Sequence, residues 1–227
     1  MAGPAARGAA TAVYVESTPK RAFAGAFEWP GWCRSGRDEE RALEALAAAA
    51  PRYGAVAAEA GLEFPVRHDF QVAERLPGSA TTDFGAPGAV AARDQEPVTR
   101  PEAERLVALV TASWTVLERV AARAPAELRK GPRGGGRDRD AIVTHVLGAE
   151  SAYARKLGIK LPPPAPDDPA AIAELRDAII AALGTVSDGR PPVPGGWPQR
   201  YAARRVAWHA LDHAWEIEDR SEQPAQG

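Results

Sequence analysis

The chain has few of the features that would place it in a common class of protein. One cysteine, Cys33, occurs in 227 residues, which excludes an internal disulfide framework and is typical of a reducing compartment. No run of about 18 apolar residues is present, so no transmembrane helix is expected, and the N-terminal residues lack the apolar segment of a signal peptide. The formal net charge of -2 gives no strong attraction to nucleic acid or to an anionic membrane. These absences predict a cytoplasmic protein that binds neither.

Several catalytic signatures are also missing. The glycines of the segment GPRGGGR do not form a GxxxxGKS/T phosphate loop, and neither a Rossmann fingerprint nor a Ser-His-Asp nucleophile elbow occurs. Cys33 has no neighbouring base that would activate its thiol. The chain does have 45% apolar residues, enough to build a core, so we expect a folded protein rather than a disordered one.

The first half of the chain has the pattern of a small mixed α and β segment. Pro30, Gly31 and Gly36 predict a loop, Asp38 is a suitable N-cap for the helix that follows, and Pro51 should bend or restart that helix. The order is ββαβ. In chain order, the expected elements are strands at residues 12–17 and 21–27, a helix at 38–59 and a strand at 70–76.

The second half changes to a helical period of 3.6. Its connecting segments are rich in glycine and proline, and four helices of this length with moderate loops predict an antiparallel four-helix bundle. The fold class is therefore α+β, with an α/β domain at residues 1–98 and a bundle at 99–227, linked by the Gly- and Pro-rich stretch 77–100. The expected helices cover residues 102–123, 138–157, 169–186 and 198–220.

Three of the four histidines fall where the bundle could bring them together. His209 and His213 are spaced i, i+4 in the apolar stripe of the last helix, so their imidazoles share one helix face. His145 belongs to an expected inward row of the second helix, whereas His68 has no paired ligand. Three imidazole nitrogens would hold a divalent metal, Zn²⁺ or Ni²⁺, and leave one coordination position open. The expected inward row comprises Ile142, His145, Ala149 and Ala152.

The same three histidines could also serve without a metal. They could line a binding or proton-transfer pocket, or act as structural core residues. Burying a neutral imidazole without partners costs about 1–3 kcal/mol, so three in one core favour the metal site. Acidic residues near them could fix an imidazole tautomer by accepting its second ring N–H, or could simply face solvent. These candidates are Asp212, Glu150 and Glu216.

The connection before the second bundle helix, RKGPRGGGRDRD, is basic and rich in glycine. It could steer an anionic substrate or the carboxylates of a thiol toward the site. The alternative is a solvated connection in which Asp138 caps the following helix, and this second interpretation is favoured.

The helical half resembles the DinB-like bundle superfamily, which includes thiol-dependent transferases and maleylpyruvate isomerases. The resemblance covers about residues 100–220 and rests on the phrases THVLGAE and WHALDHAWEIEDR. In that family a histidine of the second helix and an HxxxH pair of the last helix bind a divalent metal, which by position implies His145, His209 and His213. Family members often have a further histidine after the pair, whereas Glu216 and Glu218 follow it here.

The first half resembles the HicB-like small α/β domain in its ββαβ order and in the phrase FEWPGWCRSGRDEERALEAL. That domain holds a toxin partner in toxin–antitoxin systems. No DNA-binding segment is visible here, so an accessory or interface role is expected.

The bundle resemblance implies a metal-dependent transferase or isomerase of small molecules, and chemistry with a low-molecular-weight thiol is the favoured form of that activity. Because members of the bundle family often dimerise, a homodimer is compatible with this interpretation. The alternative is a non-catalytic protein that binds a ligand or a partner and retains a degenerate metal site.

Overall fold

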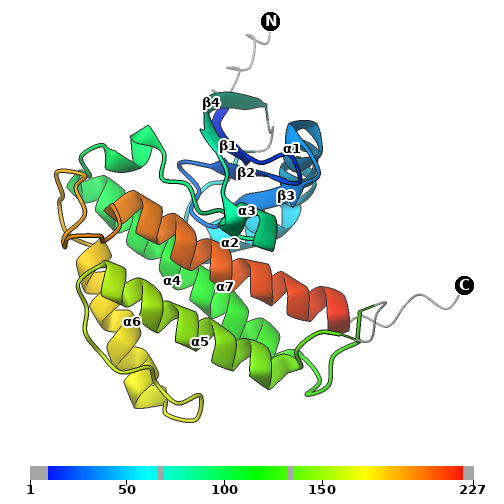
Figure 1. The fold of residues 1–227 in the computed structure, drawn as a ribbon. Coiled ribbons are helices and arrows are strands. Elements are labelled where there is room, and N and C mark those ends of the chain that lie inside the picture. The colour runs from blue at the N-terminus through cyan, green and yellow to red at the C-terminus, as the bar shows by residue number, and fades with distance from the viewer. Residues whose placement is uncertain (1–9, 66–68, 132–134, 222–227) are drawn as a thin grey trace, which may run out of the picture. The chain divides into compact units, whose positions relative to one another are not determined.

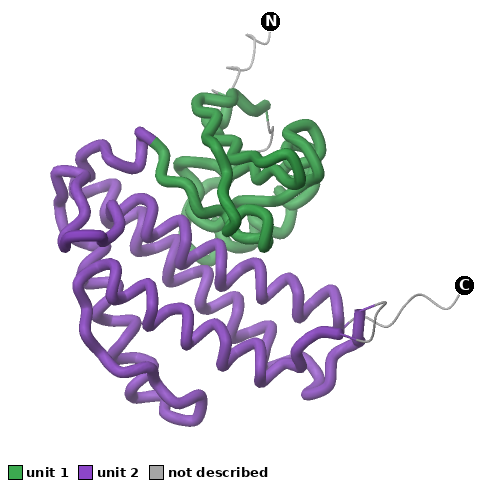
Figure 2. Tube along the Cα trace, viewed as in Figure 1, with its two compact units in different colours: residues 1–91 green, residues 92–227 purple. Residues whose placement is uncertain are grey.

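The structure is a computed structural model that describes residues 10–65, 69–131 and 135–221. Expectations for His68 and for residues 132–134 therefore lie outside the described residues. The described chain confirms the α+β class, with one four-stranded sheet and seven α-helices (Figure 1). It divides into two compact units, residues 1–91 and 92–227 (Figure 2). Within the described ranges, no helix combines the length and apolar character needed to cross a bilayer.

The first unit is built on a sheet with strand order β3-β2-β1-β4. The predicted hairpin is confirmed, because β1 pairs antiparallel with β2, and β1 also pairs in parallel with β4. Asp38 caps α1 as expected, accepting a hydrogen bond from the Arg41 backbone N–H at 2.9 Å. The elements are β1 (Thr11–Ser17), β2 (Ala22–Ala26), β3 (Cys33–Gly36), α1 (Glu39–Ala48), α2 (Ala50–Glu59), β4 (Phe70–Pro77) and α3 (Ala80–Phe84).

Two segments of this unit differ from the sequence prediction. The predicted loop around Gly36 contains strand β3, which pairs antiparallel with β2, so the order of the unit, with α3 included, is βββααβα rather than ββαβ. A tight turn, closed by the Trp32 N–H bonding the Trp29 carbonyl at 2.9 Å, returns the chain alongside β2. In the stretch expected to be a linker, Ser79 and Thr82 form a capping box that starts the short helix α3.

A buried carboxylate ties that stretch to the sheet. Glu16 of β1 is fully buried and accepts hydrogen bonds from the Thr82 hydroxyl and from the backbone N–H groups of Gly88 and Ala89. These donors stabilise the charge of a carboxylate that has no access to water. Residues 78–91 are therefore an ordered part of the first unit and not a free connection.

The second unit contains four long helices that begin and end close to their predicted positions. The last helix, α7, packs against both α4 and α5, and α6 also packs against α4 and α5. The elements are η1 (Ala92–Gln95), α4 (Arg100–Arg123), α5 (Arg139–Lys156), α6 (Pro169–Leu183) and α7 (Gln199–Ser221).

The expected antiparallel order is wrong for one consecutive pair of helices. The C-terminal ends of α5 and α6 both lie at the start of α7: the Trp197 N–H donates to the Lys156 carbonyl at 3.0 Å, and the Gln199 side chain donates to the Leu183 carbonyl. Helices α5 and α6 therefore run parallel, as do α4 and α7 (Figure 1). The reason is that the connection at residues 157–168 travels back along the bundle instead of turning directly into α6.

The boundary between the units, at 91/92, lies before the expected boundary at 98/99. Residues in between are bonded to the helical unit. Asp94 of η1 forms a buried ion pair with Arg204 of α7, with Arg204 Nε 2.9 Å from Asp94 Oδ1. Val98 exchanges backbone hydrogen bonds with Ser187 in the connection before α7. These bonds make residues 92–98 part of the second unit.

Candidate metal centre

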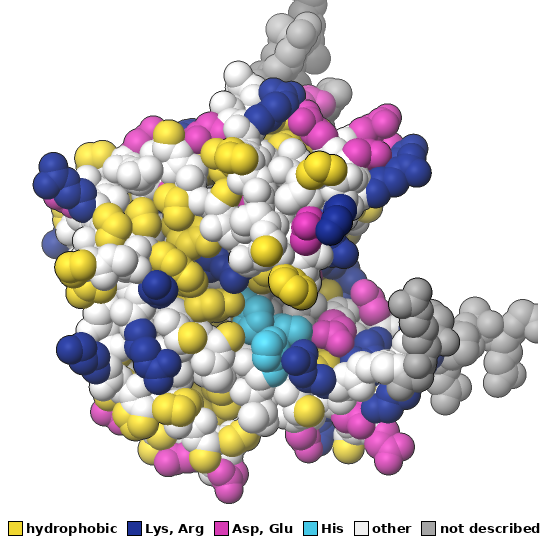
Figure 3. All heavy atoms as spheres, viewed as in Figure 1, with side chains coloured by type: hydrophobic (Ala, Val, Ile, Leu, Met, Phe, Trp, Pro, Cys, Tyr) yellow, Lys and Arg dark blue, Asp and Glu magenta, His cyan; other side chains and the backbone are white. Residues whose placement is uncertain are grey.

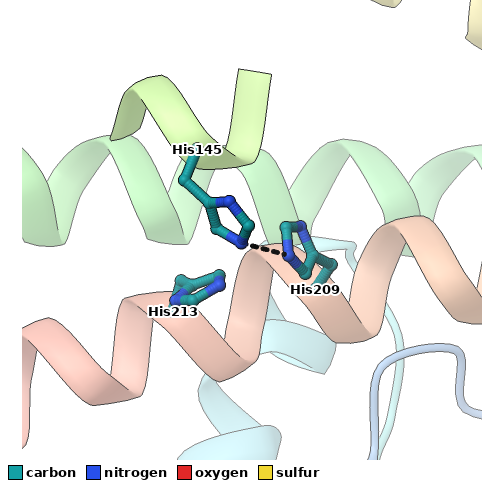
Figure 4. A group of neighbouring side chains, drawn as sticks. All are labelled: His145, His209 and His213. Atoms are coloured by element: carbon teal, nitrogen blue, oxygen red, sulfur yellow. Dashed lines mark hydrogen bonds between the residues drawn. The ribbon is translucent and has the colours of Figure 1, made fainter. Parts of the chain in front are cut away.

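The three histidines singled out in the sequence lie together in the second unit. His145 comes from α5, and His209 and His213 come from successive turns of α7, with their rings directed toward one another (Figure 4). One ring nitrogen of each lies within 4.8 Å of the other two. Over the part of the chain that is described, this is the one group of His, Cys, Asp and Glu side chains close enough to share a metal ion.

The packing of α7 explains why two polar side chains, His209 and His213, lie on a helix that is largely buried. Every residue of α7 from Gln199 to Leu211 is buried except the half-buried Arg200, because the helix is covered by its neighbours. His145 sits differently from the expectation. The buried face of α5 is formed by Ile142, Val146 and Glu150 among others, and Ala152 of the expected inward row is exposed. His145 therefore lies at the edge of the buried face.

The separation of the closest two nitrogens matches shared metal ligation. Nε2 of His145 lies 3.3 Å from Nε2 of His209. Two imidazoles that bind one tetrahedral Zn²⁺ at about 2.0–2.1 Å place their nitrogens about 3.3 Å apart. The contact is also a hydrogen bond between the two rings, so the same separation suits a metal-free protein in which one of the two Nε2 atoms carries a proton (Figure 4). The residues present therefore fit a divalent ion, because one nitrogen of His213 lies within 4.8 Å of the other two.

Burial favours the neutral imidazoles that metal binding requires. His209 is only 7% exposed, and its burial, reinforced by the charges of His213 and His145, lowers its pKa from 6.5 to about 2. Burial also lowers the pKa of His145, with the charge of His213 adding to the effect. Because protons compete with a metal for the same ring nitrogen, these shifts keep His145 and His209 available to a metal near neutral pH.

Glu216, one of the acidic candidates, contacts one of the three imidazoles. Its Oε2 lies 2.8 Å from Nδ1 of His213, so an Nδ1–H that donates to this carboxylate leaves Nε2 free for the cluster. The other oxygen, Oε1, accepts a hydrogen bond from Arg220 at 2.8 Å. The bond to His213, followed by that to Arg220, lowers the pKa of Glu216 and favours its charged form.

Glu150 has a different role from the one expected. It is buried, and its two oxygens bond the Arg176 guanidinium of α6 at 3.1 and 3.3 Å. Five residues along a helix correspond to about 140° around its axis, so Glu150 is turned away from His145 and toward α6. Asp212 is half-buried and lies between His209 and His213 in the sequence of α7, and its role stays a prediction.

Two residues that the sequence analysis did not single out border the cluster. The ring of Tyr153 lies 5.7 Å from that of His209, and its hydroxyl is 3.2 Å from Nη2 of Arg205. Arg205 also places its guanidinium over the Tyr153 and Trp208 rings. The available signal was helical spacing, since Arg205 precedes His209 by four residues and shares its face.

The site is accessible from outside the bundle. His145 and His213 are only half-buried, and histidine side chains reach the surface beside basic side chains in Figure 3. The positive charge of Arg137, in the connection before α5, lowers the pKa of both His145 and His209. The charged Glu216 acts on the pKa of His145 in the opposite direction.

Comparisons with known proteins add no family to this description. No protein-family model matches the chain, and neither a curated protein nor a solved structure matches it significantly. The candidate centre therefore depends on its own geometry.

Proposed function

We propose that the protein binds a divalent metal, Zn²⁺ or Ni²⁺, through His145, His209 and His213 and uses it to transfer or isomerise a small molecule. The observation that carries the proposal is the 3.3 Å separation of two ring nitrogens, with the third ligand atom within 4.8 Å. Three protein ligands leave one position open, which is typical of catalytic rather than structural zinc sites. A low-molecular-weight thiol is the favoured ligand, because the bundle resembles DinB-like proteins.

Each side chain would have a separate role in such a site. A divalent ion lowers the pKa of a water or thiol at its open position and so provides a nucleophile at neutral pH. His209 supplies a ligand that stays neutral, and Glu216 keeps the Nε2 of His213 directed at the cluster. Arg137 contributes positive charge that attracts an anionic reactant.

One observation favours a second candidate, a non-catalytic binding protein with a degenerate site. The Nδ1 atom of His209 is buried, and no described residue forms a hydrogen bond with it. Histidines that bind metals almost always donate this second ring N–H to an acceptor. His209 departs from that rule, whereas His213 follows it.

Metal titration separates the two candidates. Purified protein stripped with a chelator is titrated calorimetrically with Zn²⁺ and with Ni²⁺, alongside His145→Ala, His209→Ala and His213→Ala. We expect about one ion per chain in the wild type and loss of tight binding in each variant, because each removes one of three ligands. Thr144→Ala, an exposed neighbour of His145 on α5, is the matched control and should bind like the wild type.

The open position is tested on the same preparations. Adding free cysteine to the Co²⁺-loaded wild type should produce thiolate-to-metal absorption, since a soft thiolate takes the vacant coordination position. A wild-type chain that keeps its fold and binds no divalent ion contradicts the catalytic proposal and supports the binding protein. A metal-loaded chain that gives no spectral response to thiols contradicts only the proposal that a thiol is the ligand.

A further inference from the structure

The carboxylate that orients His213 is itself held by the connection between α4 and α5. Arg220, one helical turn after Glu216, donates from Nη1 to Glu216 Oε1 at 2.8 Å. Its Nε donates to the backbone carbonyl of Arg129 at 2.8 Å. Glu216 is thus held between His213 and Arg220, while Arg220 is held between Glu216 and the connection.

The same connection also donates hydrogen bonds to the end of α7. The Arg129 backbone N–H donates to the Arg220 carbonyl at 3.0 Å, and Arg129 Nη2 donates to the Asp219 carbonyl at 2.7 Å. Carbonyls in the last turn of a helix have no partner within the helix. Arg129 supplies partners for two of them, so the last turn of α7 and Arg129 are bonded in both directions.

Glycine at position 136 lets the connection cross the guanidinium of Arg220. Gly136 has φ +122, and a Cβ added there would lie 2.8 Å from Nη2 and 3.0 Å from Cζ of Arg220. Both the backbone conformation and the close approach therefore require glycine. Asp138 stands at the N-cap position of α5 as expected, but its side chain makes no bond to the helix and accepts hydrogen bonds from the Leu128 N–H and from Lys130.

We infer that Arg220, which is bonded to Arg129 and lies against Gly136, is a positioning residue for the metal ligand His213 and acts through Glu216. The inference rests on the proposed metal function. Arg220 contacts none of the three histidines in the bonds described, yet it fixes the carboxylate on which the ring of His213 depends. Changes to such outer partners typically weaken metal binding about 10–100-fold.

A role in stability alone predicts a different result. The Arg220–Glu216 pair is an i, i+4 ion pair on a helix, and pairs of this type stabilise a helix whether or not a metal site lies nearby. Loss of the pair would then leave the metal affinity unchanged. Metal affinity and the proton position on His213 are therefore the quantities that distinguish positioning from stability.

The test compares full-length variants stripped of metal and titrated with Zn²⁺. We expect Glu216→Ala and Arg220→Gln to raise the Kd about 10–100-fold. Arg220→Lys should give a smaller rise, because an ammonium keeps the charge but lacks the fork that bonds Glu216 and Arg129 together. The matched control is Arg41→Gln, which removes an i, i+3 ion pair in the first unit and should leave the Kd unchanged.

Nitrogen NMR of the metal-free proteins gives an independent measurement. In the wild type we expect the neutral His213 ring to carry its proton on Nδ1. In Arg220→Gln we expect a mixture of the Nδ1–H and Nε2–H tautomers. A zinc-binding wild type whose Kd and ring tautomer survive Arg220→Gln overturns this inference and leaves the proposed function intact. A wild type that binds no Zn²⁺ overturns both.

Discussion

At the scale of single residues, His209 is the histidine of the candidate site whose burial is most costly for folding. It is the most buried of the three histidines, its ring lies 4.7 Å from that of His213 and 5.1 Å from that of His145, and its Nδ1 has no hydrogen-bond partner among the described residues. Leaving a buried donor unsatisfied costs about 1–3 kcal/mol. Such a cost is expected where a side chain is retained for function rather than stability.

Replacing His209 with leucine should therefore abolish metal binding and stabilise the metal-free protein by about 1 kcal/mol, because it removes the unsatisfied donor. Acid sensitivity should fall as well. The folded-state pKa of His209 is about 2, below the ordinary value of 6.5, so the unfolded chain takes up more protons and stability is lost as the pH falls below 6.5. At pH 5 this linkage amounts to about 2 kcal/mol, which the variant should not lose.

Urea unfolding of both proteins in the presence of a chelator, at about pH 7 and about pH 5, measures these differences. Thr144→Ala, on the exposed side of α5, serves again as the control and should keep the wild-type pH dependence. A variant less stable than the wild type at both pH values would show that the imidazole has a partner in the folded protein.

At the scale of elements, the start of α4 is fixed by a local motif and by a bond from a distant helix. Glu102 accepts hydrogen bonds from the backbone N–H and hydroxyl of Thr99 and from Arg200 at the start of α7. The Arg200 bond, followed by those from Thr99, lowers the pKa of Glu102 from 4.5 to about 2. The capping box and the ion pair thus hold two helix starts together.

Glu102→Gln should destabilise the protein by about 1 kcal/mol at neutral pH, since the Glu102 side chain is 42% exposed and solvent weakens the pair. The charged carboxylate contributes this stability above the unfolded pKa of 4.5, and it is lost as the pH falls toward 2. The two proteins should therefore become equally stable near the acid end. Urea unfolding across that range tests this, and a constant difference at every pH would refute the role of charge.

The helices and strands also show which parts of the fold could be predicted from the sequence. The helices of the second unit were predictable, because their apolar residues recur with period 3.6 between turn-rich connections. Strand β3 was not, since four residues with the sequence CRSG carry no alternation of apolar and polar side chains. The parallel course of α5 and α6 was equally hidden, because helical periodicity carries no information about direction.

The candidate site was predictable in part for the same kind of reason. The i, i+4 spacing placed His209 and His213 on one face whatever the fold, and Glu216 followed within one turn. Partners from other helices could not be assigned. Glu150 bonds Arg176 of α6, and Glu216 bonds Arg220, which depends in turn on Arg129 from the connection before α5.

At the scale of the whole molecule, each unit provides its own partners for its buried carboxylates. Glu16 holds residues 88 and 89 within the first unit, and Asp94 pairs with Arg204 within the second. All three histidines, together with Glu216 and Arg220, belong to the second unit. The candidate centre should therefore survive separation of the units, provided that the cut leaves these buried bonds intact.

A fragment of residues 92–227 should fold on its own and bind Zn²⁺ with the Kd of the full chain. A fragment that starts at residue 99 should have a free energy of unfolding about 3–5 kcal/mol lower than that of the longer fragment. The shorter fragment lacks Asp94 and so removes one side of a buried ion pair, in which Arg204 is 6% exposed. Asp94→Asn in the full chain isolates that contribution. Circular dichroism melts and zinc titrations of the three proteins provide the measurement. Equal stability of the two fragments would show that η1 contributes nothing to the helical unit, and a stable longer fragment without zinc affinity would show that the centre needs the first unit.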